Sequence, residues 1–413
     1  MKDFQGLSIR PGTFYLPARE EDQAAWPIVA CDQYTAQKEK WEQADRLVGE
    51  APSALRLIIP ECYLDESDER VPRIQRTMDA YLEKGVVCPE VSGMVLVERE
   101  TQSGKRLGLV ATVDLEDYSY APGSCSPIRP TEGTIVSRIP PRQKVRRGAA
   151  LELSHVLLLC DDAERTVIEP LYANRAQLRR VYDVELMLDG GHLRGWAVED
   201  EETLRKVAGA VRKLKEKLPP GGILFAVGDG NHSLATAKAH WEEAKKNLPK
   251  EEWTGHPARF AMVELNNIYD SALVFEPIHR VLFGVTEEAV LSALREAQLI
   301  PDETQPDLTL VSKAGARPFR IGKPLHTLPV GTVQKLLDQW DGLNLDYVHG
   351  DDAVREIVKK ENAVGILLPP MRKEDLFPAV TKNGPLPRKT FSMGEANEKR
   401  YYMEARKIVK DKA

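Results

Sequence analysis

The amino-acid sequence predicts an α+β fold with a mixed β-sheet at its core. Segments in which apolar residues recur at helical spacing alternate along the chain with short β-rich runs. No repeat with a period of about 20–50 residues is present, which argues against a solenoid. The 413 residues, at roughly 150 per domain, are enough for two or three domains with filled cores.

The first half of the chain contains one predicted helix and two predicted hairpins. Residues 67–84 are expected to form the helix, because apolar side chains recur there at helical spacing. Residues 94–98 and 106–113 are β-rich and flank a glycine-containing turn, so we expect them to pair. Residues 184–188 and 193–198 are expected to form a second hairpin around another glycine-containing turn.

The second half begins with a predicted charged helix at 201–217, which ends at a Pro-Pro-Gly-Gly sequence. A buried strand at 223–227 follows, and a long helix is expected at 234–247. Three later strands and one charged terminal helix are expected at 259–265, 308–312, 363–368 and 397–410.

Two loops divide the chain into three predicted regions. The stretch 120–123 and the polar loop 249–257 contain the prolines and glycines that are typical of boundaries. The regions are an N-terminal α/β region with a hairpin (1–120), a central region (121–250) and a C-terminal α/β region (251–413).

The composition excludes several classes of protein. The 63 acidic and 57 basic side chains leave a net charge of −6, which is not the charge of a generally basic nucleic-acid coat. No apolar run approaches the ~20 residues that span a bilayer, and the first residues lack the apolar centre of a signal peptide. Five cysteines without a C-x-x-C pair argue against a disulfide framework and a cysteine zinc site. These features predict a cytoplasmic protein with reduced thiols and no membrane partner.

The strongest local signal is the segment Gly228–Ser233, which joins the predicted strand to the long helix. Its glycines permit close approach of the backbone to a ligand, and the first turn of a helix offers unpaired N–H groups to a phosphate or carboxylate. Asp229 could hold a magnesium ion or accept a proton, and His232 could stabilise transferred charge or act as acid or base. The candidate anion-binding residues are Gly228, Gly230, Asn231 and Ser233.

A structural interpretation of the same segment is open as well. A D-G-N turn followed by a serine N-cap is also the form of an ordinary strand-to-helix connection. That interpretation assigns no structural role to His232. The similar sequence 189–192 lies inside a hairpin pattern and is expected to be a turn.

The second signal is a basic segment from Arg129 to Arg147, which holds six basic side chains and one acid, a balance of +5. Hydroxyl groups and forked arginine cations in one loop suit an oxyanion. The candidate anion ligands are Arg129, Thr131, Thr134 and Arg138. Glu132, a lone carboxylate among cations, is a candidate base or metal ligand. The basic residues from 142 to 147 are expected to form a solvated face.

Two weaker candidates lie near the ends of the chain. Arg388 and Lys389 follow a proline-rich stretch and could contact an anion. Asp32 could be a carboxylate of the site or the N-cap of a helix.

Several common motifs are absent from the sequence. It has no G-x-x-x-x-G-K-[ST] loop, no G-x-G-x-x-G after a strand, no H-E-x-x-H and no G-x-S-x-G. The basic segments also lack interleaved aromatic residues, which disfavours stacking on single-stranded nucleic acid.

The motifs together resemble the family called domain of unknown function 1015, in which an alanine-aspartate-glycine-x-histidine-arginine run opens a helix. The resemblance extends over nearly the whole chain. Its parts are ACDQY near the N-terminus, PSALRLIIPE at 52–61, RPTEGT at 129–134, ILFAVGDGNHSLATAKAHWE from 223, FEPIHRVL at 275–282, YVHG at 347–350 and PLPRKTF at 385–391.

The D-G-x-H core is also similar to that of the ParB and sulfiredoxin-like superfamily, which includes free-serine kinases and nucleotide-binding partition proteins. The resemblance implies a ParB/sulfiredoxin-like strand-turn-helix unit in which the residues from Gly228 to His232 cradle phosphates. It also implies that Asp229 and His232 lie close to the transferred group. Ser233 stands where the family pattern has arginine, so Arg129 or Arg138 would have to supply that charge from another loop.

Three functions are compatible with these residues. The first is a phosphotransferase that acts on a small hydroxylated metabolite, with a nucleotide or pyrophosphate donor and Mg²⁺, and with Glu132 or Asp32 as base. The second is a sensor that binds a nucleotide or an anionic metabolite without catalysis. The third, association with DNA by analogy with partition proteins, is the weakest. An anionic small molecule is the expected partner, and the oligomeric state is open.

Overall fold

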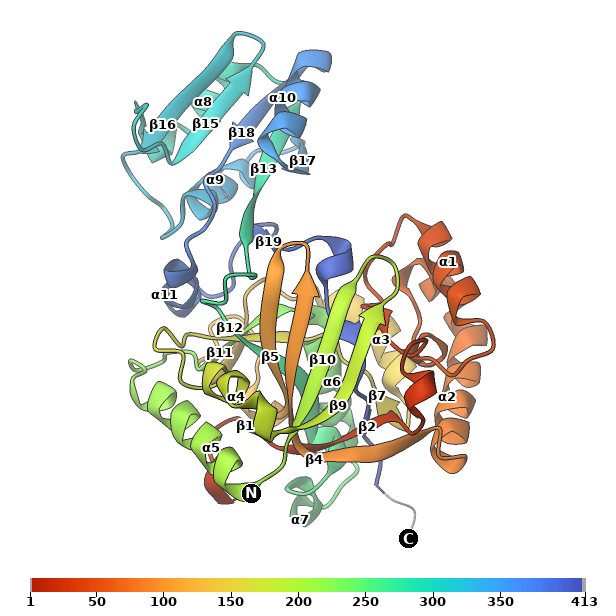
Figure 1. Ribbon diagram of the computed structural model, residues 1–413. Helices are drawn as coiled ribbons and strands as arrows, with labels where there is room; N and C mark the ends of the chain where they lie inside the picture. The colour runs from red at the N-terminus through yellow and green to blue at the C-terminus, as the bar shows by residue number, and fades with distance from the viewer. Residues whose placement is uncertain (1, 411–413) are drawn as a thin grey trace. The chain divides into compact units, whose positions relative to one another are not determined.

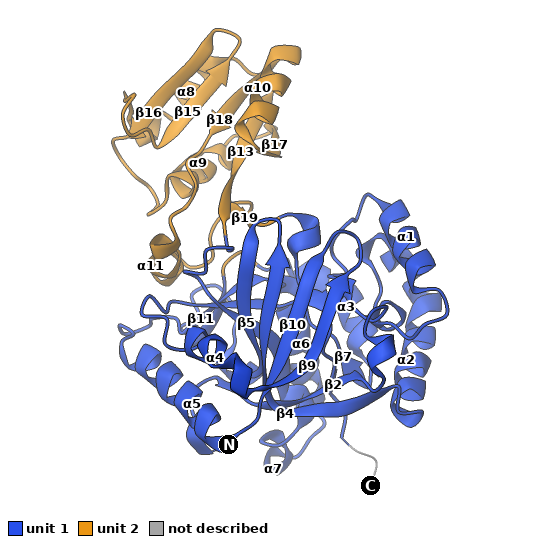
Figure 2. Cartoon of the chain, viewed as in Figure 1, with its two compact units in different colours: residues 1–130, 134–273, 395–413 blue, residues 131–133, 274–394 orange. Residues whose placement is uncertain are grey.

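The computed structural model describes residues 2–410 and separates them into two compact units (Figure 2). Unit 1 comprises residues up to 130, 134–273 and those from 395 onward, and unit 2 comprises 131–133 and 274–394. This division differs from the three consecutive regions predicted from the sequence, because the chain leaves unit 1 after residue 273 and returns to it at 395. The predicted α+β class is confirmed.

The centre of unit 1 is a ten-stranded sheet with the order β6-β11-β8-β12-β5-β4-β10-β9, while β1 pairs with β5 and β2 with β4. Two pairs, β6–β11 and β8–β12, are parallel and the others are antiparallel, so the sheet is mixed as predicted. The strands are β1 (Ile9–Arg10), β2 (Gly12–Pro17), β4 (Val87–Thr101), β5 (Gly104–Asp114), β6 (Ile128–Pro130), β8 (Leu157–Cys160), β9 (Arg179–Leu186), β10 (Gly191–Val198), β11 (Phe225–Asp229) and β12 (Phe260–Asn267).

The sheet of unit 1 is covered by hydrophobic residues on both faces. Successive side chains of a strand point to opposite faces. Met94 and Leu96 therefore belong to one buried cluster, and Val95 and Val97 belong to the other. Helices α1 (Lys38–Val48) and α2 (Ser67–Glu83) contribute to the cluster of Val95, and α5 (Glu201–Glu216) and α6 (Asn231–Lys245) contribute to the cluster of Met94 (Figure 1). The other α-helices among the described residues of unit 1 are α3 (Ile139–Arg146), α4 (Glu169–Ala173) and α7 (Lys250–Trp253).

The predicted elements of unit 1 up to residue 273 are confirmed, with several differences in their bounds. Both hairpins form, as β4–β5 and β9–β10, and β4 begins earlier than predicted because Val87 to Gly93 pair with β2. The predicted helices 67–84, 201–217 and 234–247 are α2, α5 and α6. Helix α6 begins at Asn231, since Gly230 is its N-cap, so Ser233 lies inside the first turn and does not cap the helix.

The predicted terminal helix at 397–410 is wrong. The segment contains a short 3₁₀ helix, η10 (Ala396–Glu398), and two short strands, β20 (Tyr401–Tyr402) and β21 (Arg406–Lys407). These strands pair with β3 (Ile28–Val29) and β7 (Leu151–Glu152). A surface helix needs one polar face, whereas every residue from 400 to 406 is buried in unit 1. Among the charged side chains that indicated a solvated helix, Arg400 pairs with Glu404 and Glu264, and Arg406 pairs with Glu152, all inside the core.

Unit 2 is built around a seven-stranded antiparallel sheet with the order β14-β16-β15-β18-β13-β17, and β19 pairs with β13. Its strands are β13 (Phe275–Phe283), β14 (Leu299–Pro301), β15 (Leu308–Ser312), β16 (Gly315–Ile321), β17 (Asn344–His349), β18 (Ala363–Leu367) and β19 (Phe391–Met393). Its helices are α8 (Glu287–Ala293), α9 (Pro329–Leu337), α10 (Asp351–Lys360) and α11 (Lys373–Asn383). The predicted strands at 308–312 and 363–368 are β15 and β18, and the one at 259–265 is β12 of unit 1.

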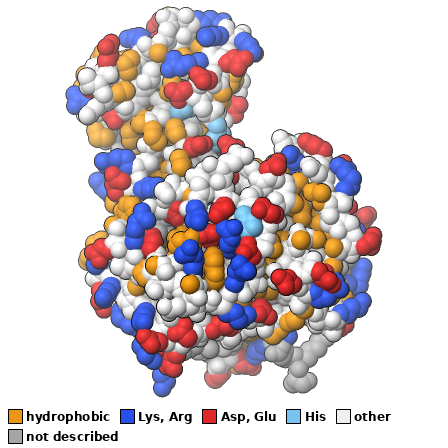
Figure 3. All heavy atoms as spheres, in the orientation of Figure 1, with side chains coloured by type: hydrophobic (Ala, Val, Ile, Leu, Met, Phe, Trp, Pro, Cys, Tyr) orange, Lys and Arg blue, Asp and Glu red, His pale blue; other side chains and the backbone are white. Residues whose placement is uncertain are grey.

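The surface and the cysteines agree with the composition. Acidic and basic side chains are mixed over the visible face of unit 1 (Figure 3). The five cysteines are all free. Among residues 2–410, no helix has both the length and the apolar character needed to cross a membrane.

Candidate functional site

The candidate site lies in unit 1, where β11 ends and α6 begins. The pairing of β11 with β8 shifts register between Val227 and Asp229, so Gly228 lies in a β-bulge. A bulge bends a strand and redirects its side chains. Asp229 follows the bulge, and its Oδ1 accepts a hydrogen bond of 2.8 Å from the N–H of Gly230.

Gly230 holds the start of α6 against the segment that leads into β8. Its φ of 75° lies in the left-handed region that favours glycine. A Cβ atom at this position would lie 2.9 Å from Cα of Val156 and 3.3 Å from Cδ2 of His155. The glycine therefore permits the first turn of α6 to approach His155, which the sequence analysis did not single out.

His155 connects Asp32 to Tyr402. Its Nε2 lies 3.5 Å from Oδ2 of Asp32, and its Nδ1 lies 2.6 Å from the hydroxyl oxygen of Tyr402. The same hydroxyl oxygen accepts the N–H of Cys31 at 3.1 Å. Asp32 is thus part of this cluster and not the N-cap of α1, whose N-cap is Gln37.

Both members of the Asp32–His155 pair are charged near neutral pH. Burial alone would lower the pKa of His155, but the Asp32 carboxylate, with smaller contributions from Cys31 and Asp229, outweighs burial and raises that pKa to about 10. Burial alone would raise the pKa of Asp32, but the charge of His155, the hydrogen bond from Gln33 and the charge of Lys399 lower it. The imidazolium therefore carries hydrogen on both ring nitrogens.

Lys399 brings a second cation to the site from the C-terminal segment. Its Nζ lies 3.4 Å from Oδ2 of Asp229, and its side chain is 15 % exposed. The buried Arg99 side chain donates to the carbonyl oxygens of Asn397 (2.8 Å) and Lys399 (3.3 Å). The backbone around Lys399 is therefore held by a guanidinium from β4.

His232 occupies the first turn of α6 as a neutral imidazole. Burial, and after it the positive charges of Arg142 and Arg138, lower its pKa to about 4. Its Nε2 accepts the N–H of Ile135 at 3.2 Å, so the ring hydrogen lies on Nδ1. His232 was expected to act as an acid or base. Because the lone pair of Nε2 already accepts the Ile135 N–H, His232 can offer only its Nδ1–H, as a hydrogen-bond donor.

The first turn of α6 also contains a polar group without a partner. The side-chain oxygen of Asn231 is buried and makes no hydrogen bond among the described residues. The N–H groups of a helix's first turn have no intrahelical acceptor. Backbone donors and a buried amide therefore lie together beside Asp229 and His232.

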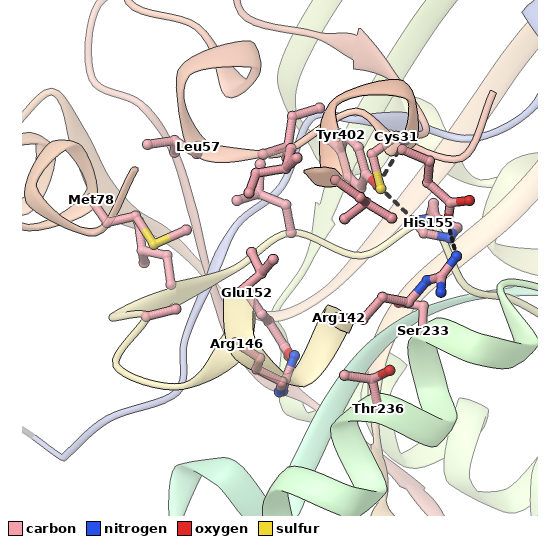
Figure 4. Close-up of a pocket in the computed structure, with 18 residues that line it drawn as sticks. Cys31, Leu57, Met78, Arg142, Arg146, Glu152, His155, Ser233, Thr236 and Tyr402 are labelled. Carbon is pink, nitrogen blue, oxygen red and sulfur yellow. Dashed lines mark hydrogen bonds and ion pairs between the residues drawn. The ribbon is translucent and has the colours of Figure 1, made fainter. Parts of the chain in front are cut away.

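A cavity of about 130 Å³ reaches this cluster from the side of α2 and α3. Cys31, His155, Ser233 and Tyr402 form its polar end, where Ser233 comes from α6 (Figure 4). Leu57 and Met78 lie at the opposite, apolar end.

The sequence analysis expected Arg129 near the N-terminus of α6, but the structure places its side chain elsewhere. Its Nη1 donates to the carbonyl oxygen of Ser124 (3.2 Å) and its Nη2 to that of Gly221 (2.5 Å). Gly221 precedes β11, whereas Gly230 follows it. Because β6 runs parallel to β11 with Arg129 opposite Ala226, the Arg129 side chain extends toward the start of β11 and holds two loops together there.

The other predicted anion ligands are divided between the units. Thr134 and Arg138 belong to unit 1. The hydroxyl oxygen of Thr134 is buried. Arg138 is exposed, and its carbonyl oxygen accepts the Nη1 hydrogen of Arg142 at 2.8 Å.

Thr131, Glu132, Arg388 and Lys389 belong to unit 2. The Thr131 carbonyl accepts the N–H of Leu386 at 2.7 Å, and Oε1 of Glu132 accepts the N–H of Lys389 at 3.3 Å. Arg388 and Lys389 are exposed, and the Arg388 carbonyl accepts from the buried Arg280 at 3.3 Å. These residues hold the 131–133 segment and the 385–390 loop together within unit 2.

The basic segment after Arg138 is not simply a solvated face. Arg142 pairs with Glu61, Arg146 with the buried Glu152, Lys144 with Asp68 and Arg147 with Glu243. Arg142 and Arg146 also line the cavity. Of the four basic residues from 142 to 147, all of which were expected to be exposed, Lys144 and Arg147 are exposed and Arg142 and Arg146 are partly buried.

The sequence analysis missed His155, Lys399 and Tyr402. His155 precedes the apolar strand β8, where a single histidine carries no motif. Lys399 and Tyr402 lie in the segment interpreted as a surface helix. The run Tyr401-Tyr402-Met403, too apolar for an exposed face, was the signal that the segment is buried.

The comparisons with known proteins give a family and distant likenesses in structure. Among curated proteins, none matches the sequence. A free serine kinase variant in complex with ADP is 12% identical over 73% of this chain and 92% of its own, with a TM-score of 0.39. A conserved hypothetical protein from Pyrococcus furiosus is 13% identical over 69% of this chain and 90% of its own, with a TM-score of 0.35. SbnI from Staphylococcus aureus, truncated at its C-terminus, is 10% identical over 74% of this chain and 84% of its own, with a TM-score of 0.36.

The family model described as "Protein of unknown function (DUF1015)" matches residues 13–409. The match covers nearly the whole chain and agrees with the resemblance found in the motifs. The chain belongs to this family of proteins of unknown function.

Proposed function

We propose that unit 1 transfers a phosphoryl group from a nucleotide or pyrophosphate to the hydroxyl of a small molecule. The observation that carries the proposal is the convergence of the Asp32–His155 ion pair with the first turn of α6. Phosphoryl transfer requires mainly positioning and neutralisation of charge. This cluster offers a carboxylate for the hydroxyl and, beside it, several donors for the phosphate.

In this reaction Asp32 receives the acceptor hydroxyl. Its carboxylate is held by the hydrogen bond from Gln33 Nε2 (2.9 Å) and by the charge of His155. The hydroxyl proton passes to Asp32 as the new oxygen–phosphorus bond forms and the bond from phosphorus to the leaving phosphate or nucleotide breaks. A carboxylate with a lowered pKa suffices, because the proton leaves late in a loose transition state.

The phosphate would be held at the N-terminus of α6. The N–H groups of the first turn and Nδ1–H of the neutral His232 donate to phosphate oxygens. Arg138, which is exposed and whose charge acts on His232, supplies the positive charge that the family pattern places at Ser233. Arg129 cannot do so, because its guanidinium is occupied at the other end of β11.

Magnesium fits this assignment as an ion shared with the phosphates. Among residues 2–410, no three His, Cys, Asp or Glu side chains are grouped to hold a metal. Mg²⁺ in phosphate-transfer sites needs only one or two carboxylates in addition to phosphate oxygens and water. Asp229 is the residue that would hold it, and the ion would neutralise phosphate charge. The ParB/sulfiredoxin-like interpretation of this strand-turn-helix unit and a cytoplasmic location belong to the same proposal.

The test is a turnover assay. Purified protein is incubated with Mg²⁺, a panel of hydroxylated metabolites and ATP, ADP or pyrophosphate, and phosphorylated product is detected by ³¹P NMR. Asp32→Asn should lower turnover by about 10²- to 10⁴-fold, the range of acid–base catalysis. The exposed Asp341→Asn in unit 2 is the matched control and should leave turnover unchanged. Full turnover by Asp32→Asn would refute its assignment.

The second candidate function is a sensor for a nucleotide or anionic metabolite. The observation in its favour is Ser233, which lines the cavity in place of the arginine of the family pattern. A sensor would bind nucleotide and yield no product with any acceptor or donor. DNA association predicts binding that weakens steeply with salt, and nothing in the site favours it.

A further inference from the structure

Helices α1 and α2 line a second cleft of unit 1, with a volume of about 610 Å³ (Figure 1). Its apolar lining is buried at Trp41, Pro60 and Ile74. Tyr63 and Tyr81 add two half-buried aromatic rings. The volume lies within the range of about 300–1,000 Å³ that is typical of small-molecule sites. We call it the α1–α2 cleft.

The two helices give the α1–α2 cleft walls of opposite charge. The acidic residues that line it come from α1 and the turn after it: Glu42, Asp45 and Glu50. The basic residues on the α2 wall are Arg70 and Arg73. They share one face of α2 with Ile74, Thr77 and Tyr81, which also line the cleft. A dipolar occupant with its charges at opposite ends therefore fits between the two helices.

Some of these charges are already neutralised by protein partners. Asp45 pairs with Arg56, which also lines the cleft, and the Arg70 guanidinium lies 2.6 Å from Glu66. The charges of Glu42, Glu50 and Arg73 are different.

These three side chains are exposed, and no ion pair or hydrogen bond engages their charged groups among residues 2–410. The uncompensated charges are thus two carboxylates on the α1 wall and one guanidinium on the α2 wall.

The separation of the walls indicates the length of the occupant. The axes of packed helices are about 8–10 Å apart even where the helices touch. A free amino acid carries its ammonium and carboxylate on one carbon atom, whereas a peptide separates them by up to about 3.3–3.6 Å for each residue. A short peptide therefore spans charges on two helices better than a free amino acid does.

We propose that the α1–α2 cleft binds a short peptide with free ends, of about the size of a dipeptide and with apolar side chains. Its ammonium group lies against Glu42 and Glu50, and its carboxylate accepts hydrogen bonds from Arg73. Its apolar side chains pack on Trp41 and Ile74. This binding does not depend on the phosphoryl transfer proposed above.

The probe is the dipeptide leucyl-phenylalanine, and its N-acetyl and C-terminal amide forms each lack one charge. Binding to the full chain is measured by NMR through the indole N–H signal of Trp41, which is assigned among the six tryptophans with Trp41→Phe. This N–H is buried and makes no hydrogen bond among the described residues. We expect the free dipeptide to shift the signal and each blocked form to bind about fivefold more weakly, because it has lost one ion pair.

Substitutions on the two walls show which end of the peptide each wall holds. Arg73→Gln should weaken binding of the free dipeptide about fivefold and leave binding of the amide form unchanged. Glu42→Gln should weaken binding of the free dipeptide and leave that of the N-acetyl form unchanged. The matched controls are Arg76→Gln and Glu39→Gln, at exposed residues of the same helices that do not line the cleft. Both controls should bind all three probes as the natural protein does.

Three results would overturn the inference. They are no shift of the Trp41 signal with the free dipeptide, equally tight binding of the blocked forms, and equal binding by Arg73→Gln and Arg76→Gln. The test is separate from the turnover assay, because its substitutions lie outside the candidate site. Dipeptide binding without turnover would retain the α1–α2 cleft as a site and refute phosphoryl transfer, and turnover without dipeptide binding would do the reverse.

Discussion

The imidazole of His155 and the carboxylate of Asp32 form an ion pair, with Nε2 3.5 Å from Oδ2. Asp32 comes from the loop after β3, and His155 comes from the segment before β8. Gly230 brings the first turn of α6 to within contact distance of the same imidazole. The ion pair is thus the point at which three segments of unit 1 meet, and the chemistry of the candidate site depends on its charge.

Removing the carboxylate should discharge the histidine. In Asp32→Asn, burial acts on His155 without its largest opposing charge, so its pKa should fall from about 10 to below the value of about 6.5 for a free imidazole. The pKa is measured by NMR titration of the His155 ring. Asp341→Asn should leave that titration unchanged. A His155 pKa that stays near 10 in Asp32→Asn would show that the ion pair does not control it.

His232 should make the protein less stable in acid. Its pKa is about 4 in the folded state and about 6.5 in the unfolded chain, so the unfolded state binds more protons between these values. Stability due to the neutral ring is complete above about pH 6.5 and is lost as the pH falls toward 4, by on the order of 2 kcal/mol. Urea unfolding at pH 7 and pH 4.5 measures the free energy of unfolding. Between these two pH values, that free energy should fall less for His232→Gln than for the natural protein. The exposed His349→Gln is the control and should behave like the natural protein.

A side chain at position 230 should displace α6. Gly230→Ala combines a left-handed φ with a Cβ atom 2.9 Å from the backbone of Val156, so we expect a loss of about 2 kcal/mol in the free energy of unfolding. Gly209→Ala in α5 has open space around its Cβ and should instead stabilise by about 0.5–1 kcal/mol, the gain of alanine over glycine in a helix. Urea unfolding of both variants measures the contrast. Equal stability of the two would mean that Gly230 is not required for this approach.

The C-terminal segment should depend on its buried ion pairs. Arg400 lies 2.9 Å from Glu264 and 2.8 Å from Glu404, and all three are buried. Arg400→Met leaves both carboxylates without this partner and should destabilise by about 3–5 kcal/mol. Arg205→Met breaks an exposed pair with Glu201 and should cost less than about 1 kcal/mol. If Arg400→Met were as mild as Arg205→Met, the buried network would not hold the segment that carries Lys399 and Tyr402.

Local patterns in the sequence were sufficient for the elements with a repeating face or a diagnostic turn. The apolar spacing of residues 67–84 marks α2, and the alternating runs on either side of glycine-containing turns mark the two hairpins of unit 1. The segment Gly228–Ser233 was recognised as a strand-to-helix connection for the same reason, because the conformation of Gly230 depends on a short stretch of chain.

Residues that reach the site through distant pairings were not predictable in this way. Arg129 and the 228–233 segment lie on adjacent parallel strands, but the direction of the Arg129 side chain depends on which carbonyl oxygens its neighbours leave free. The segment 397–410 was misassigned because its charges resemble those of a solvated helix, whereas Arg400 and Glu404 are neutralised by partners that only the folded chain brings to them.

The sequence by itself therefore determined the α+β class, the main hairpins and helices, the family and the turn at Gly230, since all of these follow from local periodicity, turn chemistry or motif order. The tertiary structure alone decided which charges meet. It paired Asp32 with His155, placed Lys399 beside Asp229, turned Arg129 away and left His232 neutral. The physical reason is that an electrostatic environment depends on burial and on neighbours within a few ångströms, and in this chain those neighbours come from segments that are far apart in sequence.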